Sequence, residues 1–95
     1  MSLAIFWTDE ATETFDSIVL FIENRWALKQ AEGFVKHTQK ILSLIADQPY
    51  MYKASLNGNN VRQAIISPQT SMFYEIHHEF ITILFFWDNR QEPIF

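Results

Sequence analysis

The chain has 95 residues, 48% of them hydrophobic and 16% aromatic, with a formal net charge of −4 at pH 7. This length predicts one domain over residues 1–95 with a single core, and the apolar content argues against disorder. The sequence contains no cysteine, which excludes disulfides and thiol chemistry. Domains that bind nucleic acid through its phosphates are usually basic, so the negative charge disfavours that class.

At the N-terminus, an apolar run from Leu3 to Trp7 contains β-favouring side chains and predicts a first strand. No basic segment precedes this run, and the run is too short for a signal peptide or a membrane span. We therefore expect a cytoplasmic protein that does not associate with a membrane.

Two helices are expected next. Thr8 is an N-cap signal, and the apolar residues after it recur at three- and four-residue spacing, which predicts an amphipathic helix from about Asp9 to Arg25. A break near Trp26 separates it from a second helix, which ends before Pro49 because proline disfavours helix at the preceding residue. An acidic stretch is followed by a basic one, a pattern typical of two solvated helix faces. The acids of the first stretch are Asp9, Glu10, Glu13, Asp16 and Glu23, and the bases that follow, against a single Glu32, are Arg25, Lys29, Lys36 and Lys40.

Three strands complete the pattern. They are expected over residues 61–67, 71–77 and 80–87, with turns at residues 57–60, 68–69 and 78–79. The short connections favour an antiparallel meander, and the almost wholly apolar last run is typical of a central strand. The expected fold class is α+β: an N-terminal strand, an α-helical hairpin, and a three-stranded antiparallel meander packed on the helices.

The sequence offers few groups for metal or cofactor chemistry. It has no Walker A loop, dinucleotide fingerprint or HExxH motif, and two glycines are too few for a phosphate-binding loop. His77 and His78 are adjacent on a strand, so their side chains point to opposite faces and do not suit one metal ion. We expect no metal site and no cofactor, and we expect the single helix histidine, His37, to be exposed.

Two arginines are better candidates for a site. Arg62 opens the first strand of the meander and Arg90 follows the last one, and we expect these two ends on the same side of the sheet with Tyr74 between them. Two guanidinium groups in that arrangement would clamp a phosphate or a carboxylate. The alternative is that each arginine pairs with a nearby acid, for example Arg90 with Asp88.

An apolar surface is also expected at the strand ends and in the tail, where side chains have little cover from their sequence neighbours. Exposed apolar patches of this kind mark partner sites, and the alternative is ordinary core packing. If a partner docks there, Phe86→Glu weakens the complex. The residues concerned are Phe80, Phe86, Ile94 and Phe95.

Five short segments stand in a characteristic order along the chain. They are Trp7-Thr8 with Ala11, Ile45 through Pro49, Val61-Arg62, Phe73 through Ile76, and Phe85 through Pro93. In this order and spacing the chain resembles, over almost its whole length, the RelE/ParE toxin superfamily of plasmid stabilisation proteins. The resemblance implies the toxin of a type II toxin–antitoxin pair, neutralised by a small antitoxin.

The superfamily has two branches with one fold, so the fold alone does not choose between them. One branch comprises ribosome-dependent mRNA endonucleases, which use several bases and a terminal Tyr or His on the scissile phosphate. The ParE-like branch binds DNA gyrase and has no nuclease site. Arg62 and Arg90 match two of the nuclease bases, and no Tyr follows Arg90. Ala64 and Ser71 stand where further bases are expected, and Trp87 where many relatives carry His. The resemblance therefore favours weak or absent nuclease activity.

Three functions remain open from the sequence. The favoured one is a ParE-like toxin that binds gyrase without enzymatic activity. The second is a RelE-like endonuclease acting through Arg62, Arg90 and either Tyr74 or Lys53, with the ribosome and mRNA as partners. The third is a non-toxic homologue that binds only a partner. An antitoxin is the expected partner, and a homodimer remains open. The residues expected to bind partners are Lys53, Phe86, Trp87 and Phe95.

Overall fold

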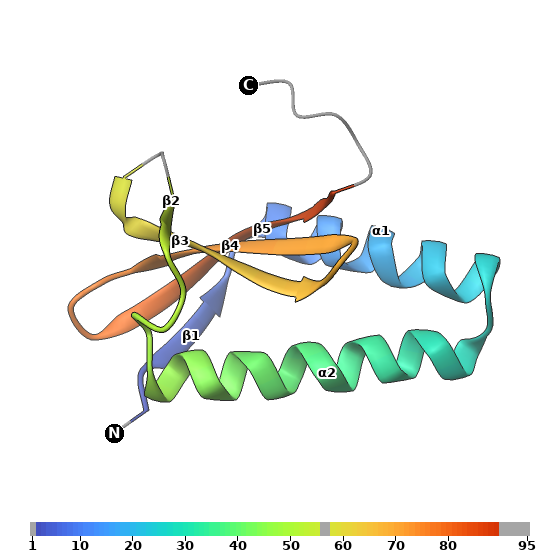
Figure 1. Ribbon diagram of the computed structural model, residues 1–95, viewed down its shortest axis with the longest axis horizontal. Coiled ribbons are helices and arrows are strands. Elements are labelled where there is room, and N and C mark those ends of the chain that lie inside the picture. The colour runs from blue at the N-terminus through green and yellow to red at the C-terminus, as the bar shows by residue number, and fades with distance from the viewer. Residues whose placement is uncertain (1, 56–57, 90–95) are drawn as a thin grey trace.

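The computed structural model describes residues 2–55 and 58–89 (Figure 1). Two helices precede a five-stranded sheet of order β1-β5-β4-β3-β2, and the predicted α+β fold is confirmed. In chain order the elements are β1 (Ala4–Trp7), α1 (Asp9–Arg25), α2 (Leu28–Asp47), β2 (Ala54–Ser55), β3 (Gly58–Ser67), β4 (Thr70–Ile76) and β5 (Phe80–Asp88).

The sheet is built on the predicted meander. Strands β3, β4 and β5 pair antiparallel in sequence order, while β1 pairs parallel with β5 along its outer edge. The apolar strand β5 is therefore flanked on both sides over Phe80–Ile83, as its composition predicts for a central strand. The two-residue strand β2, which pairs with β3, was not predicted from the sequence.

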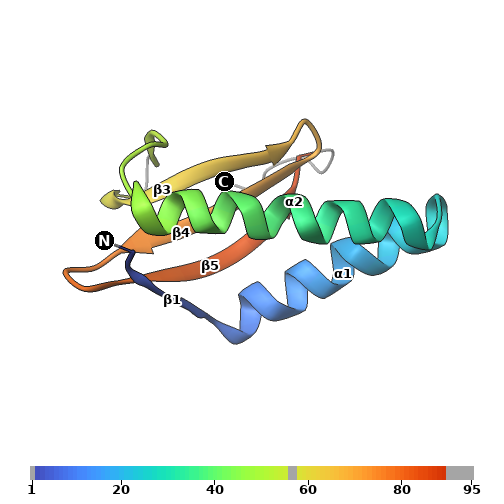
Figure 2. The ribbon, with the colours of Figure 1, turned by 90° about the horizontal axis from the view of Figure 1, so that it is seen from below.

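The two helices form an antiparallel hairpin on one face of the sheet (Figure 2). The buried core is made of the helix stripes and the alternate strand residues that face them. Its members are Ala11, Ile41, Ile45, Ala64, Ile66, Met72, Tyr74, Ile76, Ile81, Ile83 and Phe86. The opposite face carries no helix among the described residues, and there Phe73 and Phe85 stack with their ring centroids 4.8 Å apart.

Thr8 ties the start of α1 to the sheet. Its hydroxyl oxygen accepts a hydrogen bond from the Ala11 backbone nitrogen at 2.9 Å, as the N-cap signal predicts. The same hydroxyl donates to the Leu84 carbonyl oxygen at 2.7 Å, and the Thr8 backbone nitrogen donates to Ile83 at 3.1 Å. The first turn of α1 is therefore fixed beside the middle of β5.

A bulge in β5 decides which of its side chains enter the core. Phe73 is opposite Phe85 and Tyr74 is opposite Ile83, so one extra residue, Leu84, is accommodated in β5. Because of this extra residue, the next side chain after Ile83 that points into the core is Phe86 and not Phe85, and both Ile83 and Phe86 are buried. Within the described residues, no helix is long and apolar enough to cross a membrane.

Candidate functional site

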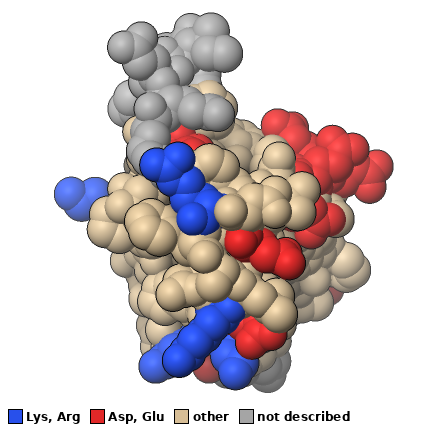
Figure 3. Space-filling view, turned by 90° about the vertical axis from the view of Figure 1, so that its right-hand side faces the viewer, with Lys and Arg blue, Asp and Glu red and all other residues tan. Residues whose placement is uncertain are grey.

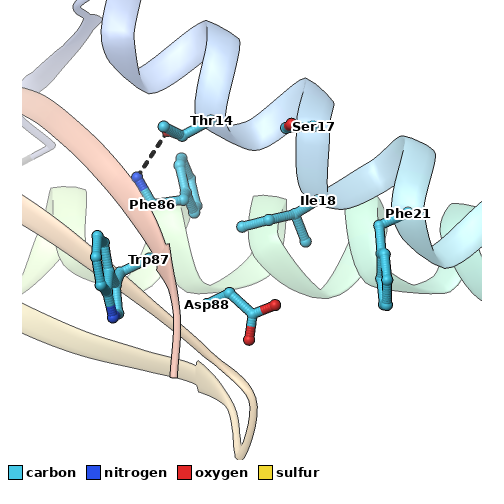
Figure 4. Close-up of a pocket in the computed structure, with 7 residues that line it drawn as sticks. All are labelled: Thr14, Ser17, Ile18, Phe21, Phe86, Trp87 and Asp88. Atoms are coloured by element: carbon cyan, nitrogen blue, oxygen red, sulfur yellow. Dashed lines mark hydrogen bonds between the residues drawn. The ribbon is translucent and has the colours of Figure 1, made fainter. Parts of the chain in front are cut away.

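A groove of about 320 Å³ lies between α1 and the end of β5 (Figure 4). Its walls consist of aromatic and aliphatic side chains, two hydroxyls and one carboxylate. These side chains come from α1 and β5, which are far apart in the sequence. The lining residues are Thr14, Ser17, Ile18, Phe21, Phe86, Trp87 and Asp88. We call this surface the α1–β5 groove.

The α1–β5 groove exists because β1 is short. β1 pairs with β5 only as far as Ile83, so the last residues of β5 have no strand on that edge. The Phe86 backbone nitrogen instead donates to the Thr14 hydroxyl oxygen at 2.9 Å, and that hydroxyl donates to the Glu10 carbonyl oxygen at 2.7 Å. A helix side chain thus replaces a strand partner at this point and leaves a concave surface beyond it.

The chemistry of the α1–β5 groove suits a protein segment better than a small reactive substrate. Phe21 is 41% exposed, and Ile18 and Trp87 are half-buried, so apolar surface is open to a partner. Large apolar side chains beside a few polar groups are the usual composition of a protein interface core and its rim. The Asp88 carboxylate provides a negative charge at one end.

Phe86 does not lie in an exposed patch, and the prediction that it does is wrong. Its side chain is 1% exposed and contacts the rings of Phe15 and Trp7, with centroid distances of 5.0 and 5.5 Å. The β5 bulge turns it inward, which the periodicity of the sequence alone does not show. Phe80 is 37% exposed, as expected. Ile94 and Phe95 lie outside the described residues.

Arg62 and Tyr74 are brought together, since they are opposite each other on β3 and β4. Tyr74 is fully buried, and its hydroxyl donates to the Pro49 carbonyl oxygen at 2.7 Å. Burial raises the pKa of Tyr74 to about 12, against the opposing effect of the nearby Arg62 guanidinium. This hydroxyl is thus held protonated and is already bonded to the backbone.

The Arg62 side chain packs on the segment before β2. Its Nη1 donates to the Tyr52 carbonyl oxygen at 2.9 Å, and its guanidinium carbon lies 5.0 Å from the centre of the Tyr50 ring. The Arg62 Nε is buried without a hydrogen-bond partner among the described residues. Lys53 is exposed in the same segment, and its carbonyl oxygen accepts from Gln63 at 3.4 Å.

The expectation that Arg62 and the end of the last strand lie on the same side is wrong. In a meander the first and third strands run in the same direction, so the start of one and the end of the other are at opposite ends. Asp88 of β5 is accordingly opposite Thr70, whereas Arg62 is opposite Tyr74. Arg90 itself lies outside the described residues.

The two positions where nuclease relatives are expected to carry further bases are buried here. Ala64 and Ser71 both have no exposed surface. The Ser71 hydroxyl accepts from Gln63 Nε2 at 3.0 Å and donates to Asn89 Oδ1 at 3.1 Å, so both its hydrogen-bonding capacities are used. Neither position offers a proton acceptor to a bound phosphate.

Two of the three histidines, His77 and His37, make local contacts. His77 Nε2 lies 3.5 Å from Glu75 Oε1 and its ring stacks on Phe80, while His37, exposed as expected, has its Nε2 2.8 Å from the Ile66 carbonyl oxygen. No group of three or more His, Cys, Asp or Glu side chains that could hold a metal occurs within residues 2–55 and 58–89.

Chains in several solved structures have a similar fold. The chromosomal ParDE system from P. aeruginosa has a chain similar to this one with a TM-score of 0.76 and 15% identity, covering 92% of this chain and 96% of that one. A chain of the YoeB dimer from S. aureus is similar with a TM-score of 0.65 and 15% identity, covering 90% of this chain and 94% of that one. A chain of the E. coli DinJ-YafQ toxin–antitoxin complex is similar with a TM-score of 0.63 and 12% identity, covering 95% of this chain and 96% of that one.

The sequence itself identifies the family. Residues 5–93 match the ParE toxin family of type II toxin–antitoxin systems, parDE, and the chain therefore belongs to that family. The resemblance to the RelE/ParE superfamily is confirmed. No curated protein matches the chain.

Proposed function

We propose that this protein is a ParE-like toxin that acts by binding DNA gyrase and not by cutting mRNA, and that a cognate antitoxin neutralises it. The observation that carries the choice is the state of three of the candidate nuclease positions within the described residues. Tyr74 is buried with its hydroxyl bonded to Pro49, Ala64 has no functional group, and Ser71 is buried with both hydrogen-bonding capacities used. General acid–base catalysis needs groups that reach the substrate, and these do not.

The family match supports the same choice, because the matched family is that of ParE toxins. The similarity to YafQ and YoeB does not weigh against it, since identities of 12% and 15% concern the fold alone. An RelE-like endonuclease would have to act through Arg62 together with residues outside the described part. Arg62 is held by Tyr52 and Tyr50, which favours a structural role for it.

Two assays separate binding from cleavage. Purified toxin added to bacterial DNA gyrase is expected to inhibit supercoiling at micromolar concentration, and primer extension on translated mRNA after induction is expected to show no new cleavage within codons. Toxin that leaves supercoiling unchanged at micromolar concentration would count against gyrase as the target. Codon-specific cleavage would replace the proposal with the endonuclease alternative.

The α1–β5 groove is the surface we propose for the antitoxin. A partner segment with apolar side chains and one base would fill the surface around Ile18 and Trp87 and approach Asp88. Phe21→Ser is expected to weaken binding of the small protein encoded beside the toxin gene by about tenfold or more, because interface aromatics often carry over 1 kcal/mol. Leu20→Ser is the matched control, because Leu20 is exposed next to Phe21 but does not line the groove. Equal binding by both variants in calorimetry would place the antitoxin elsewhere.

A further inference from the structure

A second groove, of about 310 Å³, runs between α1 and α2 on the side of the hairpin away from the sheet. Its floor is apolar, with Val19 from α1 and Leu28, Ala31 and Val35 from α2. Leu28 is 57% exposed although it is a large apolar side chain. We call this surface the hairpin groove; it lies on the flank of α1 opposite the α1–β5 groove.

The two sides of the hairpin groove differ in charge, acidic on α1 and mainly basic on α2. On α1, Asp16 and Glu23 are exposed and seven residues apart, which places them in one row along the helix. On α2, Lys29 and Lys36 are exposed with the same spacing and form a second row, which is interrupted by the exposed Glu32 that also lines the groove. Figure 3 shows acidic side chains gathered at its upper right and basic side chains along its lower edge, with further acidic side chains between and beside them and basic ones at the upper centre. Within the described residues, no ion pair joins the two rows.

The charged rows are also level with each other along the hairpin. The turn that joins the antiparallel helices is at Trp26, and Glu23 and Lys29 are each three residues from it. Asp16 and Lys36 are each ten residues from it. Because each helical residue advances 1.5 Å, the two members of each pair stand at nearly the same height.

This arrangement is complementary to itself. A two-fold axis parallel to the hairpin groove exchanges the two sides, so the acidic row of one copy faces the basic row of the other. Glu23 then stands opposite Lys29 of the second copy and Asp16 opposite its Lys36, while the two apolar floors meet between the rows. A two-fold axis across the groove would instead oppose acids to acids.

We propose that this face is the interface of a homodimer, with a second copy of the chain as its occupant. Helices about 25 Å long and side by side over about 20 Å offer on the order of 500 Å² per copy. The total is then near the lower limit for a specific interface. We therefore expect a weak dimer that is sensitive to salt, since exposed charges are screened within about 10 Å at 0.1 M.

Charge-reversed variants of the full chain test the pairing. D16K/E23K carries two basic rows and K29E/K36E carries two acidic rows, so neither is expected to dimerise by itself. Mixing them is expected to restore a dimer of mixed composition, seen by sedimentation velocity and native mass spectrometry. The wild type is expected to dimerise at about 100 μM in low salt and to lose at least tenfold in dimer affinity at about 0.5 M salt.

The controls place the same charge changes elsewhere. Glu10→Lys and Lys53→Glu alter exposed residues that belong to neither charged row and are expected to leave the dimer intact. Far-UV circular dichroism on every variant confirms that it is folded. A wild type that is monomeric at about 100 μM in low salt, or folded variants that stay monomeric when mixed, would overturn the proposal. Neither result would bear on the proposed function, because that function is tested by gyrase inhibition and not by dimerisation.

Discussion

At the scale of single residues, Tyr74 shows how a side chain expected in catalysis serves the core. Its hydroxyl donates to the Pro49 carbonyl oxygen and connects β4 to the segment after α2. Tyr74→Phe removes one hydrogen bond and leaves a carbonyl without a donor, so it is expected to cost about 1 kcal/mol of unfolding free energy. That corresponds to about 4–8 °C in Tm by thermal unfolding. Gyrase inhibition by the folded variant is expected to be unchanged, and its loss would give Tyr74 a direct functional role.

The raised pKa of Tyr74 predicts a loss of stability in alkali. The unfolded chain releases this proton near pH 10, whereas the folded chain keeps it until about pH 12 because the ring is buried. Between these values the folded state binds more protons, so its stability falls as pH rises. Urea unfolding of wild type and Tyr74→Phe at steps from pH 9 to pH 12 is expected to show the larger decline in the wild type. Parallel curves would show that Tyr74 ionises alike in both states.

At the scale of elements, the sequence predicts what local chemistry decides. The bounds of α1 follow from its N-cap at Thr8 and its apolar spacing, and the structure has the same bounds, Asp9–Arg25. The meander follows from three apolar runs and two short turns. By contrast, β2 has only two residues, and its pairing depends on β3. No periodicity predicts so short a strand.

The candidate sites depend on features that no local pattern contains. The bulge at Leu84 turns Phe86 into the core, and it exists only because β5 pairs with β4 in a shifted register. The α1–β5 groove forms because β1 ends beside Ile83 and because Thr14 of α1 then bonds to the Phe86 N–H in place of a strand. The sequence could therefore predict that Trp87 lies near the surface, but it could not predict that Phe86 is buried.

Thr14 allows the contact between α1 and β5 to be measured. Thr14→Val keeps the β-branched shape but removes the acceptor of the Phe86 N–H, which should cost about 1–3 kcal/mol of unfolding free energy. Thr12→Val is the matched control, because Thr12 is exposed on the same helix and makes only a long bond to the Thr8 carbonyl oxygen at 3.4 Å. Its cost is expected within about 0.5 kcal/mol. Similar losses for both variants in urea unfolding would mean that the Phe86 N–H is satisfied without Thr14.

At the scale of the whole molecule, the two grooves occupy opposite flanks of α1, so their proposed partners need not compete. An antitoxin that binds only folded toxin stabilises it by RT ln(1 + [L]/Kd), about 2.7 kcal/mol at one hundred times Kd. D16K/E23K changes only the hairpin side, so it is expected to gain the same stabilisation as the wild type. Phe21→Ser changes only the α1–β5 side, so it is expected to gain less while it still dimerises.

Thermal unfolding with and without antitoxin, together with sedimentation of the toxin alone, gives both quantities for each variant. We expect D16K/E23K to lose dimerisation and keep antitoxin binding, and Phe21→Ser to lose antitoxin binding and keep dimerisation. If D16K/E23K loses antitoxin-dependent stabilisation as well, the two partners share one surface of α1. The hairpin groove would then belong to the antitoxin site, because a change on one side of α1 would not weaken a partner that binds only the other side.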